Sequence, residues 1–147
     1  MLKSDAFYPP NGAGWRLFLK RTVDTEAFNP KLRPLAIVPG YGMNSYILGY
    51  HPTGMSMEAY LASRGFEIWS MNFRGQDFTI REGGEKDYGL RDIALVDLPA
   101  ALAGVRENTR TRTKKIDLLG CSLGGTYVYA YAALQRRNPL EIGRAHV

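Results

Sequence analysis

The sequence predicts an α/β protein with a mostly parallel sheet, and three observations carry this prediction. Short apolar runs at 35–38, 66–72 and 116–119 are typical of strands that are buried on both faces. Helix-forming segments lie between these runs and after the last of them. Each run is followed by a glycine-containing turn. Strands that alternate with helices in this way favour parallel pairing, because a parallel neighbour needs a crossover connection.

The N-terminal residues are predicted to form the edge of the sheet. Residues 1–8 have an irregular pattern, and residues 9–14 form a strong turn signal of proline, asparagine and glycine. Residues 15–23 alternate apolar and polar side chains, which predicts one strand. We expect this strand to form a hairpin with the chain near 6–8. Residues 24–33 then predict a loop.

Two crossover helices are predicted in the central part. Ser56 is the expected N-cap of a helix over 57–64, and Gly65 is expected to end it. A second helix is predicted over 92–105 from its apolar spacing. Pro99 lies inside this helix and should kink it or mark a break.

The last apolar run leads into the motif around which the candidate site is organised. Residues 120–124 read GCSLG, a G-x-S-x-G motif between the strand and a helix predicted over 127–135. In a strand–turn–helix setting this motif holds its central residue in a strained backbone conformation and exposes the side chain. Ser122 is therefore a candidate nucleophile. It would stand at a helix N-terminus, where the N–H of Leu123 and the helix dipole favour a developing oxyanion.

Other interpretations of the motif remain open. Gly120 and Gly124 leave room for neighbouring backbone, so a turn that only lets the helix pack on the sheet is one alternative. A phosphate-binding loop is another, but Thr126 follows Gly125 directly and the lysine that would reach the phosphates is missing. A G-x-G-x-x-G dinucleotide motif is also absent, because Ser122 occupies the place of its second glycine.

A second glycine motif, Gly40-Tyr41-Gly42, follows the strand at 35–38. Two glycines around one residue allow a sharp turn whose backbone amide points into a cleft. We expect Gly40 to adopt a positive φ, and the N–H of Tyr41 to supply the second oxyanion donor. The alternative is a loop that simply turns the chain. Three residues further along are candidates for the wall of an acyl pocket or for ordinary cover over the sheet: Met43, Tyr46 and Tyr50.

Taken together, these motifs resemble the α/β-hydrolase family. The glycine loop comes first and the nucleophile motif comes two strands later, as in that family. Residues 66–75 and 97–100 are similar to the acid-lipase branch, and 38–44 resembles polyhydroxyalkanoate-synthase-like relatives. The resemblance covers 15–137. It implies an α/β-hydrolase fold with a mostly parallel sheet and flanking helices.

The resemblance also implies a function. It assigns Ser122 as the nucleophile that attacks a carboxylic, lipid-like ester, and Tyr41 and Leu123 as the oxyanion-hole amides, with no cofactor and no metal. Pro39 stands where many relatives have histidine, and Cys121 lies one position before the place where the synthases have their central cysteine. Two alternatives stay open: an acyltransferase or polyester-synthase-like enzyme, and a non-catalytic binding protein with the same fold.

The family order is nucleophile, acid and then histidine, so the two partners are expected beyond residue 140. His51 does not match the position of that base and is interpreted as a loop or rim residue. Residues 142–147 (IGRAHV) match the translation of synthetic adapter DNA, ATC GGA AGA GCA CAC GTC, so we separate them from the domain 1–141 as a non-native tail. We call the turn at 120–124 the nucleophile elbow, and the helix after it the elbow helix. We expect a fold truncated after the elbow helix, with the strand at 116–119 as an aggregation-prone open edge.

Composition limits the remaining classes of protein. The chain has 147 residues, of which 45% are hydrophobic and 22% charged, which suits one globular domain. The net charge of +5 comes partly from a basic segment at 106–115, predicted to be a solvated loop, and no nucleic-acid motif accompanies it. Residues 78–87 predict a polar loop. One cysteine, no signal peptide and no transmembrane run indicate a cytoplasmic protein. Membrane-surface contact lacks support, and the sequence does not predict the oligomeric state.

Overall fold

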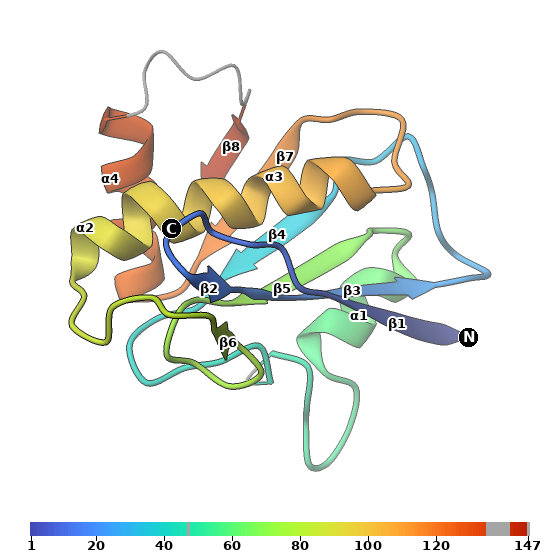
Figure 1. Ribbon diagram of the computed structural model, residues 1–147. Helices are drawn as coiled ribbons and strands as arrows, with labels where there is room; N and C mark the ends of the chain where they lie inside the picture. The colour runs from blue at the N-terminus through green and yellow to red at the C-terminus, as the bar shows by residue number, and fades with distance from the viewer. Residues whose placement is uncertain (47, 135–141, 147) are drawn as a thin grey trace.

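The computed structural model describes residues 1–46, 48–134 and 142–146. A six-stranded sheet forms its centre, in the order β1-β3-β5-β4-β7-β8 (Figure 1). Its strands are β1 (Leu2–Phe7), β3 (Phe18–Asp24), β4 (Leu35–Val38), β5 (Ile68–Asn72), β7 (Ile116–Gly120) and β8 (Ile142–His146). β5, β4, β7 and β8 are parallel neighbours, whereas β3 pairs antiparallel with both β1 and β5. The predicted mostly parallel α/β sheet is therefore confirmed.

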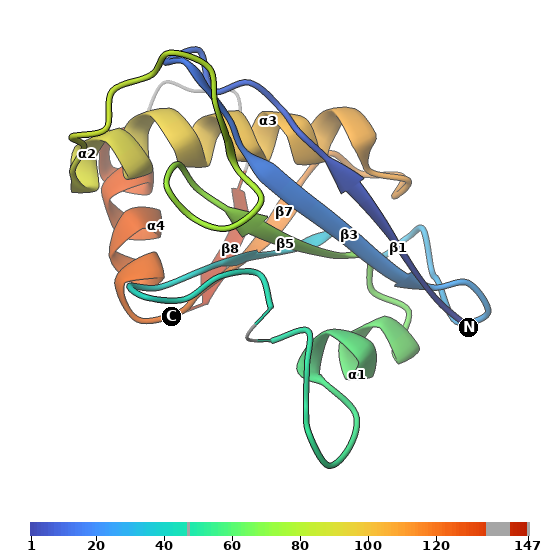
Figure 2. The same ribbon diagram turned by 60° about the horizontal axis from the view of Figure 1, so that its bottom comes forward.

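Helices cover both faces of the sheet. α1 (Met57–Ser63) lies on one face, and α3 (Leu98–Asn108) and α4 (Leu123–Leu134) lie on the other (Figure 2). The main core lies between the sheet and α3, where apolar residues of the helix recur at a spacing of three to four. Its buried members include Leu19, Ala36, Val38, Trp69, Met71, Leu98, Ala101, Leu102, Val105 and Leu118. Burial of these side chains is the main term that holds the layers together.

The helix predicted around Pro99 does not break. α2 (Leu90–Asp92), a π-helical turn (Ile93–Asp97) and α3 follow one another without a gap. The N–H of Leu98 donates to the carbonyl of Ile93, five residues back, which is the wider spacing of a π turn. Proline lacks an N–H and its ring crowds the carbonyl four residues earlier. The wider turn directly before Pro99 lets the helix continue to Asn108.

The N-terminal part differs most from its predicted form. Residues 2–7, predicted to be irregular, form β1, whose side chains are mostly exposed and so give little apolar pattern. The single strand expected over 15–23 is divided into β2 (Trp15–Arg16) and β3. Within the predicted polar loop, β6 (Ile80–Arg81) pairs with β2. This ribbon depends on contacts across the chain, such as Glu82 N–H to the carbonyl of Gly14 at 2.7 Å.

The boundaries of the other elements follow local signals more closely. The Ser56 hydroxyl accepts from the N–H of Ala59 at 3.2 Å, and Gly65 has a φ of 94°, so the predicted cap and stop of α1 are confirmed. α4 begins at Leu123, four residues earlier than predicted, and residue 135 lies outside the described residues. Residues 142–146, set apart as a tail, form β8 beside β7, so the outer edge of β7 is paired rather than open.

Candidate active site

A tight turn joins the central strand β7 to α4. Only Cys121 and Ser122 separate the two elements. Ser122 has a φ of 53°, in the left-handed region that residues with a side chain usually avoid. Two backbone hydrogen bonds hold this conformation: Gly124 N–H to the carbonyl of Cys121 at 2.8 Å, and Gly125 N–H to the carbonyl of Ser122 at 2.9 Å. The turn is thus the strained one that the motif predicts, and the Ser122 side chain is exposed.

Glycine is required on both sides of the serine because backbone approaches too closely for a side chain. A Cβ on Gly120 would lie 2.6 Å from Cα of Gly125. A Cβ on Gly124 would lie 2.3 Å from the carbonyl oxygen of Val38 and 2.7 Å from that of Pro39. The first turn of α4 therefore packs directly against both its own strand and the end of β4. This packing fixes where Ser122 stands.

The glycine loop after β4 lies against this turn. A Cβ on Gly40 would lie 2.6 Å from the carbonyl oxygen of Cys121 and 3.1 Å from Cβ of Ser122. The expected positive φ of Gly40 is wrong: Gly42 has it, at 65°. Gly40 is needed for close approach instead. The Tyr41 side chain is 87% exposed, so it is not packed between the loop and the serine.

The structure therefore brings the predicted site residues together. Ser122, the loop at 40–42 and the first residue of α4, Leu123, all lie at the carboxyl edge of β4 and β7. The N–H of Leu123 belongs to the first turn of a helix, where free donors and the dipole favour negative charge. Such an arrangement can hold an oxyanion beside a serine hydroxyl.

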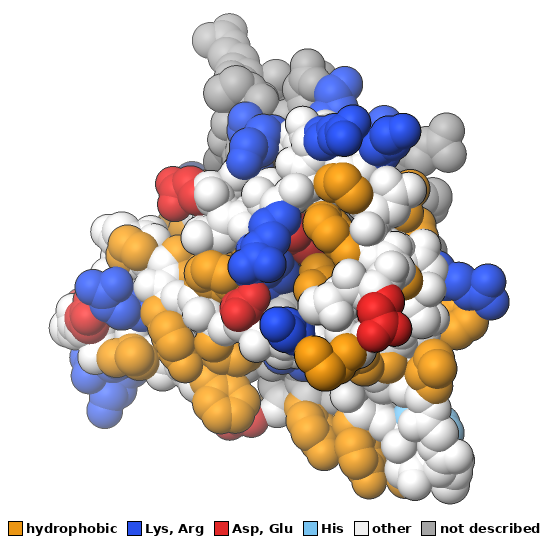
Figure 3. Space-filling view, turned by 90° about the vertical axis from the view of Figure 1, so that its right-hand side faces the viewer, with side chains coloured by type: hydrophobic (Ala, Val, Ile, Leu, Met, Phe, Trp, Pro, Cys, Tyr) orange, Lys and Arg blue, Asp and Glu red, His pale blue; other side chains and the backbone are white. Residues whose placement is uncertain are grey.

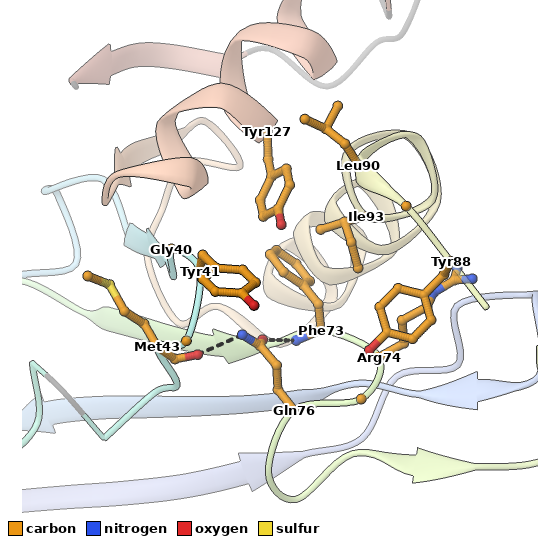
Figure 4. Close-up of a pocket in the computed structure, with 13 residues that line it drawn as sticks. Gly40, Tyr41, Met43, Phe73, Arg74, Gln76, Tyr88, Leu90, Ile93 and Tyr127 are labelled. Carbon is orange, nitrogen blue, oxygen red and sulfur yellow. Dashed lines mark hydrogen bonds between the residues drawn. The ribbon is translucent and has the colours of Figure 1, made fainter. Parts of the chain in front are cut away.

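A cavity of about 480 Å³ opens beside the loop (Figure 4). Its wall comes from the loop after β4, the turn after β5, the segment that leads into α2, and α4. Ser122 is not among the lining residues and adjoins the cavity through Gly40. The rings of Phe73 and Tyr127 meet edge to face with centroids 6.0 Å apart, and burial raises the pKa of Tyr127. Of the predicted wall residues Met43 lines the cavity, whereas Tyr46 and Tyr50 stack on each other at the surface.

A buried ion pair supports the wall of this cavity. The guanidinium of Arg74 donates to Asp97 through Nε at 3.0 and 3.1 Å and through a terminal nitrogen at 2.8 Å. Asn11 donates to the same carboxylate at 2.7 Å. Both charged side chains are almost fully buried, and each neutralises the charge of the other. Sequence reasoning missed this pair, although Arg74 and Asp97 both lie in the segments similar to acid lipases.

Two other reactive residues lie apart from the cavity. Cys121 borders a separate space of about 10 Å³ under the loop, and burial raises the pKa of its thiol. A raised pKa leaves less thiolate at neutral pH, which makes a thiol less reactive. His51 is exposed, with its Nδ1 3.3 Å from the backbone nitrogen of Thr53. The loop that carries His51 projects away from the sheet (Figure 2), and His51 does not line the cavity.

Within the described part of the chain, no cluster of His, Cys, Asp or Glu is arranged to hold a metal ion. No helix among residues 1–46, 48–134 and 142–146 is long and apolar enough to cross a membrane.

The strained serine, the glycine loop and the parallel sheet define a hydrolase-type α/β protein. The chain belongs to the alpha/beta hydrolase fold family, whose sequence model matches residues 33–144. No curated protein matches the chain significantly.

Solved structures share the fold. An alpha/beta hydrolase from Novosphingobium aromaticivorans is 21% identical, with a TM-score of 0.63 over 98% of this chain and 42% of its own. A Pyrococcus furiosus esterase is 16% identical (TM-score 0.63, 99% of this chain and 50% of its own). Potato (Solanum tuberosum) epoxide hydrolase I is 14% identical, with a TM-score of 0.66 over 97% of this chain and 39% of its own. The chain thus spans at most half the length of these proteins.

Proposed function

We propose that the protein is a serine hydrolase that cleaves a carboxylic ester through an acyl-enzyme. One observation carries the proposal: Ser122 is exposed and strained at the turn before α4, with Gly40 packed against it. Its Oγ would attack the acyl carbon while the carbonyl electron pair moves to oxygen, which the N–H groups of Tyr41 and Leu123 would hold. The alcohol would leave with a proton, and water would then release the acid. A histidine and an acid further along the full-length protein would move these protons.

The chemistry of a serine favours an ester over an epoxide as substrate. Attack of an alkoxide on an acyl carbon gives a new ester, which water can hydrolyse to regenerate Ser122. Attack on an epoxide carbon would give an ether, which water does not cleave near neutral pH. The likeness to an epoxide hydrolase therefore supports a shared fold and not a shared reaction.

The cavity supports an uncharged, lipid-like substrate. Phe73, Ile93, Leu90 and Tyr127 turn apolar surface toward it, and Arg74 is neutralised by Asp97 (Figure 4). A free carboxylate on the substrate would meet only a cation whose charge Asp97 already balances, whereas an aliphatic or aromatic group would bury apolar surface against the wall. No cofactor enters the proposed reaction.

Transfer of the acyl group to another alcohol is the second candidate reaction, and product analysis separates it from hydrolysis.

We also propose a cytoplasmic protein, because a single cysteine suits a reducing compartment, and one that does not act on nucleic acid. On the side that carries the N-terminus, lysine and arginine side chains lie in separate groups among acidic and hydrophobic ones (Figure 3). Elsewhere in the described chain Arg33 pairs with Asp117 at 3.2 Å, and Arg21, which pairs with Asp5 at 2.6 Å, is buried. A nucleic-acid surface would instead need a continuous basic stripe.

The test compares two neighbouring side chains in the full-length protein that carries this chain. Ser122→Ala should lower kcat for a p-nitrophenyl ester by about 10⁴- to 10⁶-fold and abolish labelling by a fluorophosphonate. Cys121→Ala, the matched control, should keep most of both, because its thiol faces a different cavity. Loss of labelling in Cys121→Ala with full labelling in Ser122→Ala would overturn the assignment of the nucleophile.

A further inference from the structure

We propose that Gln76 and Asn72 are positioning residues that hold the glycine loop in the shape that aims the Tyr41 N–H. This inference rests on the proposed function, because it assigns that N–H a role in the reaction. Both side chains are carboxamides that belong to the end of β5 and the turn after it, not to the loop itself. They form an amide clamp, by which we mean these two side chains and their hydrogen bonds to the loop.

Gln76 forms the first half of the clamp. Its Nε2 donates to the carbonyl of Met43 at 2.7 Å, and its Oε1 accepts from the N–H of Phe73 at 2.6 Å (Figure 4). One carboxamide thus connects the loop to the end of β5. Met43 is also the residue whose N–H donates to the carbonyl of Gly40, at 3.2 Å. Gln76 therefore fixes the far end of the turn that contains Tyr41.

Asn72 forms the second half, two residues further along the loop. Its Oδ1 accepts from the N–H of Ser45 at 2.6 Å, and its Nδ2 donates to the carbonyl of Asp77 at 2.7 Å. Asn72 itself is fully buried at the last position of β5, where its backbone pairs with Phe18. The position of Ser45 is therefore set by a side chain that cannot move without disturbing the sheet. A surface contact, Asn44 to Asp77 at 2.7 Å, lies beside this half.

Packing alone holds the tip of the loop poorly. The Tyr41 side chain is 87% exposed, and a Cβ on Gly42 would meet nothing within 4 Å. Two glycines in three residues add backbone freedom that folding has to restrict. On one side the loop touches the elbow through Gly40, and on the other the clamp supplies directed bonds. In the proposed reaction the Tyr41 N–H has to face the oxyanion beside Ser122, and rotation of the peptide between residues 40 and 41 would change its direction. A misplaced donor lowers kcat more than it weakens substrate binding, because it acts mainly on the transition state.

The experiment replaces Gln76 in the full-length protein. Gln76→Glu keeps the size and the acceptor for Phe73 N–H, but it places a carboxylate oxygen against the Met43 carbonyl. Gln76→Met keeps the length and removes both hydrogen bonds. Asn108→Asp is the matched control, because the amide of Asn108 also donates to a backbone carbonyl, that of Gly104 at 2.9 Å. It lies at the end of α3 and does not line the cavity.

Two readouts separate this inference from the proposed function. Gln76→Met should lower kcat for the ester by about 100-fold with KM changed less than about threefold, whereas Asn108→Asp should keep kcat. Gln76→Glu should lower kcat to a similar extent, and because Gln76 lines the cavity its new charge should also raise KM. Amide hydrogen exchange of residues 40–46 should become faster in both Gln76 variants and stay unchanged in Asn108→Asp.

The exchange measurement is independent of catalysis. Faster exchange in a protein that lacks Ser122-dependent turnover would support the clamp and overturn the proposed function. Unchanged exchange of residues 40–46 and unchanged kcat in both Gln76 variants would overturn the clamp. A matched loss of kcat in Asn108→Asp would also overturn it, because the effect would then be general destabilisation.

Discussion

The two halves of the candidate site are held by different means. The elbow around Ser122 is fixed by backbone hydrogen bonds between residues three apart and by glycines that admit neighbouring backbone. The loop around Tyr41 is held by side chains far along the sequence: Asn72 is 27 residues from Ser45, and Gln76 is 33 residues from Met43. Backbone contacts, both within the turn and with the end of β4, therefore hold the nucleophile, whereas hydrogen bonds from distant side chains shape the proposed oxyanion loop.

This contrast predicts different costs of substitution. Substitutions in the elbow should mainly lower the free energy of unfolding, because its close contacts are between backbone atoms that cannot move separately. Substitutions in the loop should mainly lower kcat, because the loop is a surface segment and the sheet can fold without its exact shape.

Gly124→Ala should give the largest loss of stability. Alanine would gain about 1 kcal/mol of helix propensity at this position. However, its Cβ would lie 2.3 Å from the carbonyl oxygen of Val38, and we expect a net loss of about 1–3 kcal/mol in the free energy of unfolding. Gly104→Ala in α3 is the control, because its nearest contacts are side-chain atoms, of Leu19 at 2.9 Å and of Pro9 at 3.1 Å, rather than backbone. Urea unfolding of the full-length protein that shows equal stability for both variants would contradict rigid packing of the elbow.

The sequence predicts the turn around Ser122 and the position of the glycine loop, but it does not predict the contacts that hold that loop, for a physical reason. Ser122 lies between a buried strand and a helix, and all the signals for that turn fall within a few residues. The sequence places the start of α4 too late because Gly124 and Gly125 are poor helix formers, and the contact that requires Gly124, with the Val38 carbonyl, is tertiary. In the sequence Gln76 is a polar residue in a turn, and no nearby residue indicates that its side chain binds the carbonyl of Met43.

The role of Gly40 shows the same limit. A glycine pattern indicates that a side chain is not tolerated, but it does not distinguish positive φ from close approach. The structure assigns the two causes to different residues, with close approach at Gly40 and a φ of 65° at Gly42. The edge strand β1 was missed for a related reason, because its side chains are mostly exposed and its pairing with β3 supplies the order.

The two loop glycines offer the second prediction. Gly40→Ala would place its Cβ 2.6 Å from the carbonyl oxygen of Cys121, so the loop should move off the elbow and kcat should fall by about 100-fold. Gly42→Ala meets no neighbouring atom and should cost only the left-handed strain, about 1–2 kcal/mol of stability, with kcat nearly kept. Steady-state kinetics and thermal unfolding of the two variants in the full-length protein would separate these effects. A larger loss of kcat in Gly42→Ala would reverse the assignment.

Tyr41→Phe should have the smallest effect. The substitution keeps the backbone N–H that we assign to the oxyanion, and it removes only the hydroxyl of a side chain that is 87% exposed. A surface change of this kind usually alters stability by less than about 0.5 kcal/mol. We expect kcat for the p-nitrophenyl ester to stay within about twofold of the parent, because a backbone donor does not depend on the hydroxyl. A loss of about tenfold or more, with unchanged unfolding, would show that the phenol takes part in the reaction. The loop would then act through a side chain, and the proposed oxyanion donor would have to be sought elsewhere.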